Sequence, residues 1–254
     1  MAAAVASGNL VGRAEANKRF GMADFDGWLK GIVDGLAFST ALDLCCGTGN
    51  QLVLYAARPG VRRLVGADLS RESLDAARDR VNATGFGGEL VLEAVAMEEA
   101  FTRPTVAAYR FDLVSCCYGL YYSTDVFRTL DDILAHLSPG GALFVVGPYG
   151  ANNARFFDLL QRHFTLPELV LRSATSFMGK EVAPYLKALA EVTKYTFVNP
   201  VAFSDPEAVM AYWRKTTFFD DRHEAGVRRD LEAHFTESDT FVIEKHVMAY
   251  IARV

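Results

Sequence analysis

The stretch ALDLCCGTGN, residues 41–50, decides the fold of this chain. Its apolar beginning predicts a buried strand, and the two glycines near its end, Gly47 and Gly49, allow the backbone to turn tightly into a helix. In an open α/β sheet, such a turn at the carboxyl end of the first strand faces the crevice where ligands bind. The segment therefore predicts a ligand site, although a pair of glycines can also serve a tight turn and nothing else.

A second strand, predicted over residues 63–68, ends in an acidic residue. Asp68 lies 68 − 49 = 19 residues after Gly49, close to the roughly 20 residues expected for an acid that binds ribose hydroxyls. The alternative role for Asp68 is to cap the next helix, but Ser70 already fills that role well. The spacing therefore favours a ligand that contains a ribose.

Two observations distinguish between ribose-containing ligands. A dinucleotide site requires a small residue three positions after the second glycine, where this chain has Leu52. A dinucleotide also places its pyrophosphate at the start of the helix, and Asp43, just upstream on the strand, would repel that anion. The same carboxylate would attract a ligand that carries an ammonium and a sulfonium. These residues therefore favour S-adenosylmethionine over a dinucleotide.

Short apolar runs alternate with amphipathic stretches between residues 40 and 147. Apolar residues recur at helical spacing in 70–84 and in 125–137. Strands that alternate with helices predict a parallel sheet covered by helices on both faces. The predicted strands of this region are 41–44, 64–67, 90–94, 113–117 and 142–146.

The combination of motifs resembles the class I S-adenosylmethionine-dependent methyltransferases. The glycine-rich segment is similar to the first motif of that family, and GADLS at 66–70 is similar to its second-strand acid. The resemblance continues through FDLVS at 111–115, the loop with LYY at 120–122, and LSPGGAL at 137–143. It covers roughly residues 41–146. Because one fold serves many chemistries, the motifs indicate the cofactor and leave the substrate open.

The resemblance implies an α/β fold for the whole chain: a Rossmann-like, doubly wound, mostly parallel seven-stranded sheet with an antiparallel final strand and a helical lid insertion. A single methyltransferase domain, 1–254, is expected. Helical patterns around 155–163 and 182–192 support the insertion, and 195–199 and 241–251 are predicted as strands. The expected parts are an N-terminal helical cap at 1–36, a cofactor-binding core at 37–147, a lid or substrate insertion at 148–194, and C-terminal strands and helices at 195–254.

The resemblance also implies roles for individual cofactor-binding residues. Asp43 and the turn 47–49 would hold the methionine portion, Asp68 the ribose, and Leu69 and Met97 would pack on the adenine faces. The family often has an acid just before the second apolar residue, where this chain has Ala96, so Glu98 or a backbone carbonyl would have to bind the adenine amino group. The full set of cofactor-binding candidates is Asp43, Gly47, Thr48, Gly49, Asp68, Leu69, Met97, Glu98 and Cys116.

The substrate side is expected to be aromatic. Ring faces attract a sulfonium or a cationic acceptor and exclude water, and tyrosines occur in the predicted strand-end loops, at Tyr118, Tyr121, Tyr122 and Tyr149. No catalytic residue is assigned, because none of the five histidines stands out as a general base. Clustered carboxylates are also missing near the fourth-strand loop, which predicts that no metal is needed.

The net charge and the cysteines indicate which substrates and which cellular compartment to expect. The net charge is −5 and no basic run occurs, so a nucleic-acid substrate is disfavoured. The loop 116–119 also lacks the prolines found in enzymes that methylate bases. Four cysteines form two adjacent pairs without zinc-knuckle spacing, which is typical of reduced thiols in a cytoplasmic protein. Neither a secretory signal nor a membrane span is expected.

The resulting hypothesis is transfer of a methyl group from S-adenosylmethionine to a small-molecule acceptor, on an O, N or C atom that the sequence leaves unresolved. Catalysis would come mainly from positioning donor and acceptor. Two alternatives remain: a methyltransferase that acts on nucleic acid or protein, and a non-catalytic S-adenosylmethionine-binding partner protein. The oligomeric state is left open.

Overall fold

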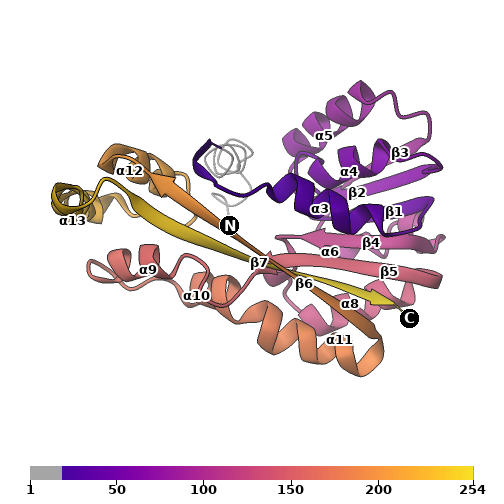
Figure 1. Ribbon diagram of the computed structural model, residues 1–254. Helices are drawn as coiled ribbons and strands as arrows, with labels where there is room; N and C mark the ends of the chain where they lie inside the picture. Colours follow the sequence, from indigo (N-terminus) through magenta and orange to yellow (C-terminus); the bar gives the residue numbers. More distant parts are fainter. Residues whose placement is uncertain (1–18, 254) are drawn as a thin grey trace. The chain divides into compact units, whose positions relative to one another are not determined.

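The computed structural model describes residues 19–253 of the chain. Its strands form one sheet in the order β3-β2-β1-β4-β5-β7-β6, and Figure 1 labels them along the chain. The strands are β1 (Thr40–Leu44), β2 (Arg63–Asp68), β3 (Glu89–Ala94), β4 (Phe111–Cys117), β5 (Leu137–Pro148), β6 (Glu191–Phe203) and β7 (Phe241–Arg253).

The sheet has the predicted topology. Strands β1 to β5 pair in parallel, and the final strand is antiparallel. In this register Asp43 on β1 lies opposite Gly66 on β2 and Ser115 on β4. The carboxyl ends of these strands therefore meet at one edge of the sheet, and the predicted fold class is confirmed.

Three of the described α-helices begin at a residue whose side chain caps them. Ser70 accepts a hydrogen bond from the backbone N–H of Ser73, and Asp125 and Asp205 cap two further helices in the same way. The α-helices are α3 (Phe25–Asp34), α4 (Asn50–Ala56), α5 (Arg71–Ala83), α6 (Met97–Ala100), α7 (Pro104–Ala107), α8 (Val126–Ala135), α9 (Ala154–Gln161), α10 (Glu168–Thr175), α11 (Ala183–Leu189), α12 (Pro206–Arg214) and α13 (Glu224–Glu237). Short helical turns are η1 (Leu120–Tyr122), η2 (Met178–Val182) and η3 (Asp221–His223).

Two boundaries differ from the sequence-based expectation. The predicted turn before the fifth strand lies inside β5, because the chain bulges there: the register with β4 shifts between Phe111 and Leu113, and Gly140 has a φ of 76°. Strand β6 begins at Glu191, so the helix expected over 182–192 is too long, and α11 ends at Leu189. Helical periodicity does not locate the residue at which a helix gives way to an exposed strand.

The chain divides into two compact units. The parallel-sheet unit comprises Leu29–Gly147, Gly179–Tyr195 and the residues from Met248 onwards. The aromatic unit comprises the described residues up to Trp28, together with Pro148–Met178 and Thr196–Val247. The predicted single domain, with its parts divided at 36, 147 and 194, stays a prediction, and residues 1–18 of the expected N-terminal cap lie outside the described residues.

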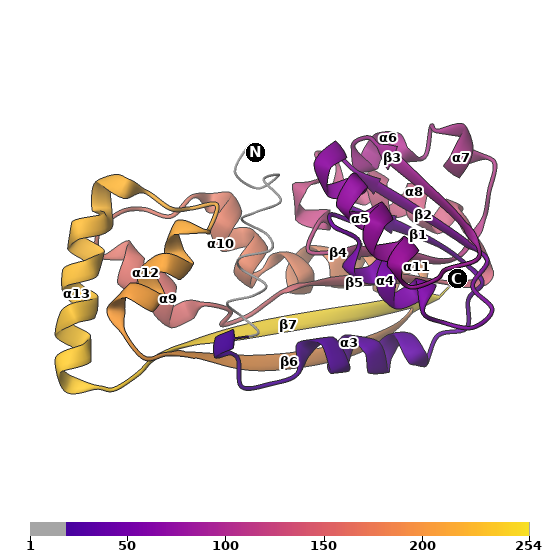
Figure 2. The same ribbon diagram turned by 90° about the horizontal axis from the view of Figure 1, so that it is seen from above.

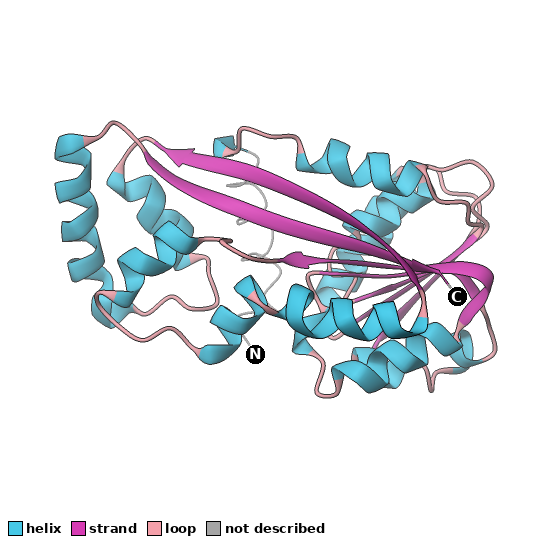
Figure 3. Ribbon diagram, turned by 60° about the horizontal axis from the view of Figure 1, so that its bottom comes forward, coloured by secondary structure: helices cyan, strands magenta, loops and turns pink. Residues whose placement is uncertain are grey.

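The parallel-sheet unit is a layered α/β structure. Figure 3 shows its strands between two layers of helices, and α4 and α5 pack against β1 and β2. The central strands are apolar nearly throughout because both faces are covered. Leu42, Leu64, Leu113 and Phe144 are fully buried. This core fixes the strand ends that carry the candidate site.

The aromatic unit has a core of its own, which is rich in aromatic rings. Trp213 and Phe156 are fully buried, and the Trp213 and Phe219 rings meet edge to face with centroids 4.9 Å apart. Helices α9, α12 and α13 lie side by side in Figure 2. None of the helices described here is both long and apolar enough to cross a membrane.

Candidate functional site

The glycine-rich turn after β1 has a left-handed backbone at three positions. Cys45, Gly47 and Gly49 have φ values of 55°, 51° and 79°. At Gly49 an added Cβ would lie 2.8 Å from the Cβ of Ala77 on α5, whereas at Gly47 it would meet nothing within 4 Å. Gly49 is therefore required for close packing against α5, and Gly47 leaves open space beside the turn. This is the division of roles expected of a loop that receives a ligand.

An arginine on α5 stabilises the same turn. Arg80 Nη1 donates hydrogen bonds to the backbone carbonyl of Thr48 at 2.7 Å and to Asn50 Oδ1 at 2.8 Å. Sequence reasoning missed Arg80, which looks like any charged residue on a helix surface. Only the packing of α5 against the turn reveals that it contributes to the shape of the site.

Asp43 is the most unusual residue of the site. It is 1% exposed, and Ser115 Oγ donates to its Oδ1 at 2.6 Å. Within the described residues, its other oxygen, Oδ2, is buried without a hydrogen-bond partner. Burial raises the pKa of Asp43 to about 7; the hydrogen bond from Ser115 lowers it, and the nearby charge of Asp68 raises it further. A buried acceptor that lacks a donor fits a site to be completed by a cationic ligand.

Asp68, the last residue of β2, stabilises the glycine-rich turn through hydrogen bonds. Its Oδ2 accepts from the backbone N–H of Gly47 at 2.9 Å, and its Oδ1 accepts from Ser70 N at 2.9 Å. Each carboxylate oxygen has a second lone pair, so both can accept a further hydrogen bond. Asp68 is half-buried at the strand end, where it can still reach a ribose hydroxyl.

The two residues expected to pack on adenine differ in exposure. Leu69 is 58% exposed directly after β2, whereas Met97 is buried at the start of α6. Glu98 Oε1 accepts from Thr124 N at 2.8 Å and from Thr124 Oγ1 at 3.2 Å. Although partial burial opposes it, these hydrogen bonds lower the pKa of Glu98, which keeps it an ionised acceptor. A role for Glu98 at the adenine amino group stays a prediction.

Cys116 lies under the turn with two neighbours. It is fully buried, and a Cβ added to Gly119 would lie 3.1 Å from its Sγ and 2.8 Å from the Sγ of Cys45. Gly119 is therefore required where these two thiols approach the loop after β4. All four cysteines are free thiols. A hydrogen bond with Cys45, and after it burial, raises the pKa of Cys116 well above its ordinary value.

The predicted tyrosines divide between the two units. Tyr118, Tyr121 and Tyr122 follow β4 in the parallel-sheet unit, and the rings of the last two lie 4.7 Å apart. Tyr118 has a φ of 58°. Tyr149 belongs to the aromatic unit, where its ring meets that of His246 edge to face. The structure thus brings three of the four tyrosines to the edge where β1 and β2 end.

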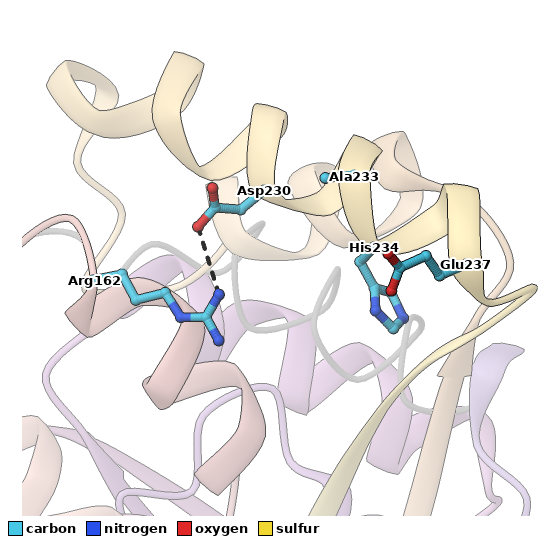
Figure 4. A pocket seen from close by; sticks show the side chains of 5 residues that line it. All are labelled: Arg162, Asp230, Ala233, His234 and Glu237. Carbon is cyan, nitrogen blue, oxygen red and sulfur yellow. Dashed lines mark ion pairs between the residues drawn. The ribbon is translucent and has the colours of Figure 1, made fainter.

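Two further features were considered as functional sites: clusters of metal-binding side chains, and a pocket in the aromatic unit. Among residues 19–253, no three His, Cys, Asp or Glu side chains gather as a metal site requires, and the expected absence of a metal stays a prediction. Figure 4 shows a pocket of the aromatic unit in which Arg162 and Asp230 form an ion pair of 3.8 Å. Its lining is completed by Ala233, His234 and Glu237, and it contains none of the predicted site residues.

The methyltransferase-domain family matches residues 41–141, the segment that contains β1 to β4 and the turns described above. Over this segment, which is about two fifths of the chain, the protein is similar to methyltransferase domains. The match supports the enzyme class and the methyl donor predicted from the glycine turn and Asp68.

Curated relatives of this chain include enzymes named for menaquinone and ubiquinone methylation. The demethylmenaquinone methyltransferase of Lactococcus lactis is 27% identical over 186 residues, which cover 70% of this chain and 64% of the relative. The ubiquinone/menaquinone biosynthesis C-methyltransferase of Hydrogenovibrio crunogenus is 35% identical over 119 residues, 46% of this chain and 44% of the relative. The chain therefore spans between about two fifths and just under two thirds of the length of these relatives.

Solved structures share the fold at low identity. The YcgJ protein of Bacillus subtilis matches with a TM-score of 0.61 and 13% identity over 90% of this chain and 97% of that one. An S-adenosylmethionine-dependent methyltransferase of Geobacter sulfurreducens, solved with S-adenosylhomocysteine, matches with a TM-score of 0.54 and 15% identity over 90% of each chain. At such identities the likeness concerns the fold.

Proposed function

We propose that this methyltransferase transfers a methyl group from S-adenosylmethionine to a small-molecule acceptor in the cytoplasm. The observation that supports the donor site best is the unpartnered oxygen of Asp43 beneath the glycine turn. A buried carboxyl with an unused acceptor is costly on its own, and the ammonium of an amino-acid moiety supplies both the charge and the donors that it lacks. The residues present therefore fit the methionine end of the cofactor.

The donor is held by groups from three strand ends. Asp43 and the backbone N–H groups of the turn would bind the methionine portion, Asp68 the ribose hydroxyls, and Leu69 and Met97 the adenine ring. When bound, S-adenosylmethionine supplies a methyl group already activated by its sulfonium. What the protein adds is orientation and exclusion of water.

Positioning is the main catalytic contribution in this proposal. Holding two reactants in line can supply effective molarities of about 10⁵–10⁸ M, whereas a positioned base adds about 10²–10⁴-fold. The tyrosines after β4 would flank the acceptor. We expect Tyr118→Phe, Tyr121→Phe, Tyr122→Phe and Tyr149→Phe each to lower turnover by less than about a thousandfold.

The acceptor that we propose first is a small, electron-rich aromatic ring. The names of the curated relatives support it, since both concern quinone methylation. The aromatic loop after β4 supports it as well, because rings pack on rings. The net charge of −5 gives no support to a polyanionic acceptor.

The experiment is a transfer assay with S-adenosylmethionine labelled in its methyl group. The acceptors are a demethylated naphthoquinol, a catechol, a primary amine, total RNA and a protein extract. We expect label in at least one small molecule, and Asp43→Asn provides the matched control with impaired donor binding. Label only in RNA or protein would overturn the small-molecule proposal, and donor binding without transfer to any acceptor would favour a non-catalytic partner protein.

A further inference from the structure

Asp43 is held in place by a serine of β4 that was not among the predicted site residues. Ser115, in the middle of the apolar strand β4, is fully buried. Its hydroxyl donates to Asp43 Oδ1 at 2.6 Å, and the carbonyl of Leu42 lies at 3.5 Å. The register places the two residues opposite each other on β1 and β4. A hydrogen bond of this length fixes the rotamer of the carboxyl group and leaves Oδ2 as its only unused oxygen.

The other groups around Asp43 cannot neutralise a charge. Asp68 on β2 is itself acidic, and its charge acts on Asp43. Burial, and after it the charge of Asp43, raises the pKa of Cys46 in the turn, Tyr55 on α4 and Cys117 on β4. Among the residues that the structure describes, the Tyr55 hydroxyl is buried without a hydrogen-bond partner. Among residues 19–253, the Asp43 carboxyl is thus influenced by acidic or neutral groups and has a single hydrogen-bond donor.

Such surroundings make the neutral carboxylic acid the favoured form of the unliganded site. A carboxylate in a buried position needs several donors or a cation, and Asp43 has one hydroxyl. Burial accordingly raises its pKa to about 7. A cationic ligand that reaches Oδ2 would reverse the balance, because an opposite charge at contact distance favours the ionised form.

We propose that Ser115 is a positioning residue for Asp43, and that the Asp43 carboxyl gives up its proton to solvent when the α-ammonium of the donor's methionine end arrives at Oδ2. The inference rests on the proposed donor site. The step is balanced: the O–H bond of the carboxylic acid breaks, a carboxylate–ammonium pair forms, and one proton leaves to the buffer. Ser115 stabilises the carboxylate that results, so it selects for ligands that carry the amino-acid portion.

The test is calorimetric titration of the full-length protein in two buffers of different ionisation enthalpy. The ligands are S-adenosylhomocysteine and 5′-methylthioadenosine, which lacks the amino-acid portion. At pH 6 we expect proton release with S-adenosylhomocysteine and none with methylthioadenosine, and the release should fall towards pH 8. If S-adenosylhomocysteine binds at pH 6 without releasing a proton, the inference fails while the donor site stands. If neither ligand binds, the proposed function fails with it.

A pair of serine variants tests the positioning role. In Ser115→Ala the Asp43 pKa should rise further, so that at pH 7 affinity for S-adenosylhomocysteine falls by about tenfold for each unit of that rise. Affinity for methylthioadenosine should change by less than about twofold, and Ser115→Thr, which keeps the hydroxyl, should restore the pH profile. Ser73→Ala, which removes the hydroxyl of another buried serine of the same unit, should leave the affinity for both ligands unchanged. Equal losses for both ligands in Ser115→Ala would show a merely structural role.

Discussion

Each unit of the molecule buries an ionisable side chain, Lys245 in one and Asp43 in the other, and the two differ in their hydrogen-bond partners. In the aromatic unit, Lys245 is 9% exposed, donates to Asn153 Oδ1 and to the Tyr212 hydroxyl, and lies 4.5 Å from the centroid of the Tyr212 ring. In the parallel-sheet unit, Asp43 has a single donor, and within the described chain one of its oxygens has no partner. The comparison teaches that a buried ionisable group with its hydrogen-bond partners in place stabilises the fold. One that lacks a partner marks the place where a ligand can supply it.

The largest expected effect concerns the turn above Asp43. Gly49→Ala must adopt a left-handed backbone, at roughly 1–2 kcal/mol, and must also displace Ala77, at about 1–3 kcal/mol more. Gly47→Ala has the first cost without the second, because nothing lies near its Cβ. Denaturant unfolding should therefore show a loss of about 2–5 kcal/mol for Gly49→Ala and about 1–2 kcal/mol for Gly47→Ala. Equal losses would contradict the division of roles between the two glycines.

The next largest effect concerns Lys245, the buried cation that has hydrogen-bond partners. Lys245→Ala leaves Asn153 and Tyr212 without their donor, and we expect the free energy of unfolding to fall by about 2–4 kcal/mol. S-adenosylhomocysteine should still bind with an affinity within about threefold of the wild type, because the cofactor contacts proposed above lie in the other unit. A stable variant that has lost cofactor binding would assign Lys245 to the site and break the comparison.

Substitution of Asp43 should change the free energy of unfolding in the opposite direction from substitution of Lys245, and the effect depends on pH. The folded pKa of Asp43, about 7, lies above its ordinary value of 3.8, so the folded protein retains a proton that the unfolded chain has lost. Stability must therefore fall as pH rises from about 4 to 7 and level off above, by at most ~1.4 kcal/mol per pH unit. Asp43→Asn removes this dependence and should be the more stable protein at pH 8. Parallel stability curves from pH 5 to pH 8 would show that Asp43 is ionised without a ligand.

The smallest effect concerns Tyr55. Its buried hydroxyl has no hydrogen-bond partner among residues 19–253, so Tyr55→Phe removes a group whose desolvation is uncompensated. We expect the free energy of unfolding to stay the same or rise by less than about 1 kcal/mol. A loss of more than about 1 kcal/mol in thermal or denaturant unfolding would mean that the hydroxyl has a partner in solution.

Much of the parallel-sheet unit could be predicted because its signals are local. The glycine turn, the acid of β2, the capping Ser70 and the apolar strands each occupy a few consecutive residues, and both faces of the sheet impose the same pattern. Asp43 and Asp68 were predicted for the same reason, as the last or next-to-last residues of adjacent strands. Their shared edge follows from the parallel topology.

The remaining features depend on contacts between distant residues. Ser115 matters because it lies opposite Asp43 on the neighbouring strand, and Arg80 matters because α5 brings it to the carbonyl of Thr48. Neither relation leaves a periodic signal. The bulge of β5 and the early start of β6 likewise depend on strand pairing, which local propensity does not encode. The division of the tyrosines between units is a property of the folded chain alone.

The most direct test of the central claim is calorimetric binding of S-adenosylhomocysteine and NADH to the wild type and to Asp68→Ala. Asp68 would make charge-assisted hydrogen bonds to the ribose hydroxyls, worth roughly 1.5–3 kcal/mol. We predict that the wild type binds S-adenosylhomocysteine and ignores NADH, and that folded Asp68→Ala binds S-adenosylhomocysteine about ten- to a hundredfold more weakly. Equal binding of NADH, or an unchanged affinity in folded Asp68→Ala, would contradict the assignment of this sheet edge to S-adenosylmethionine.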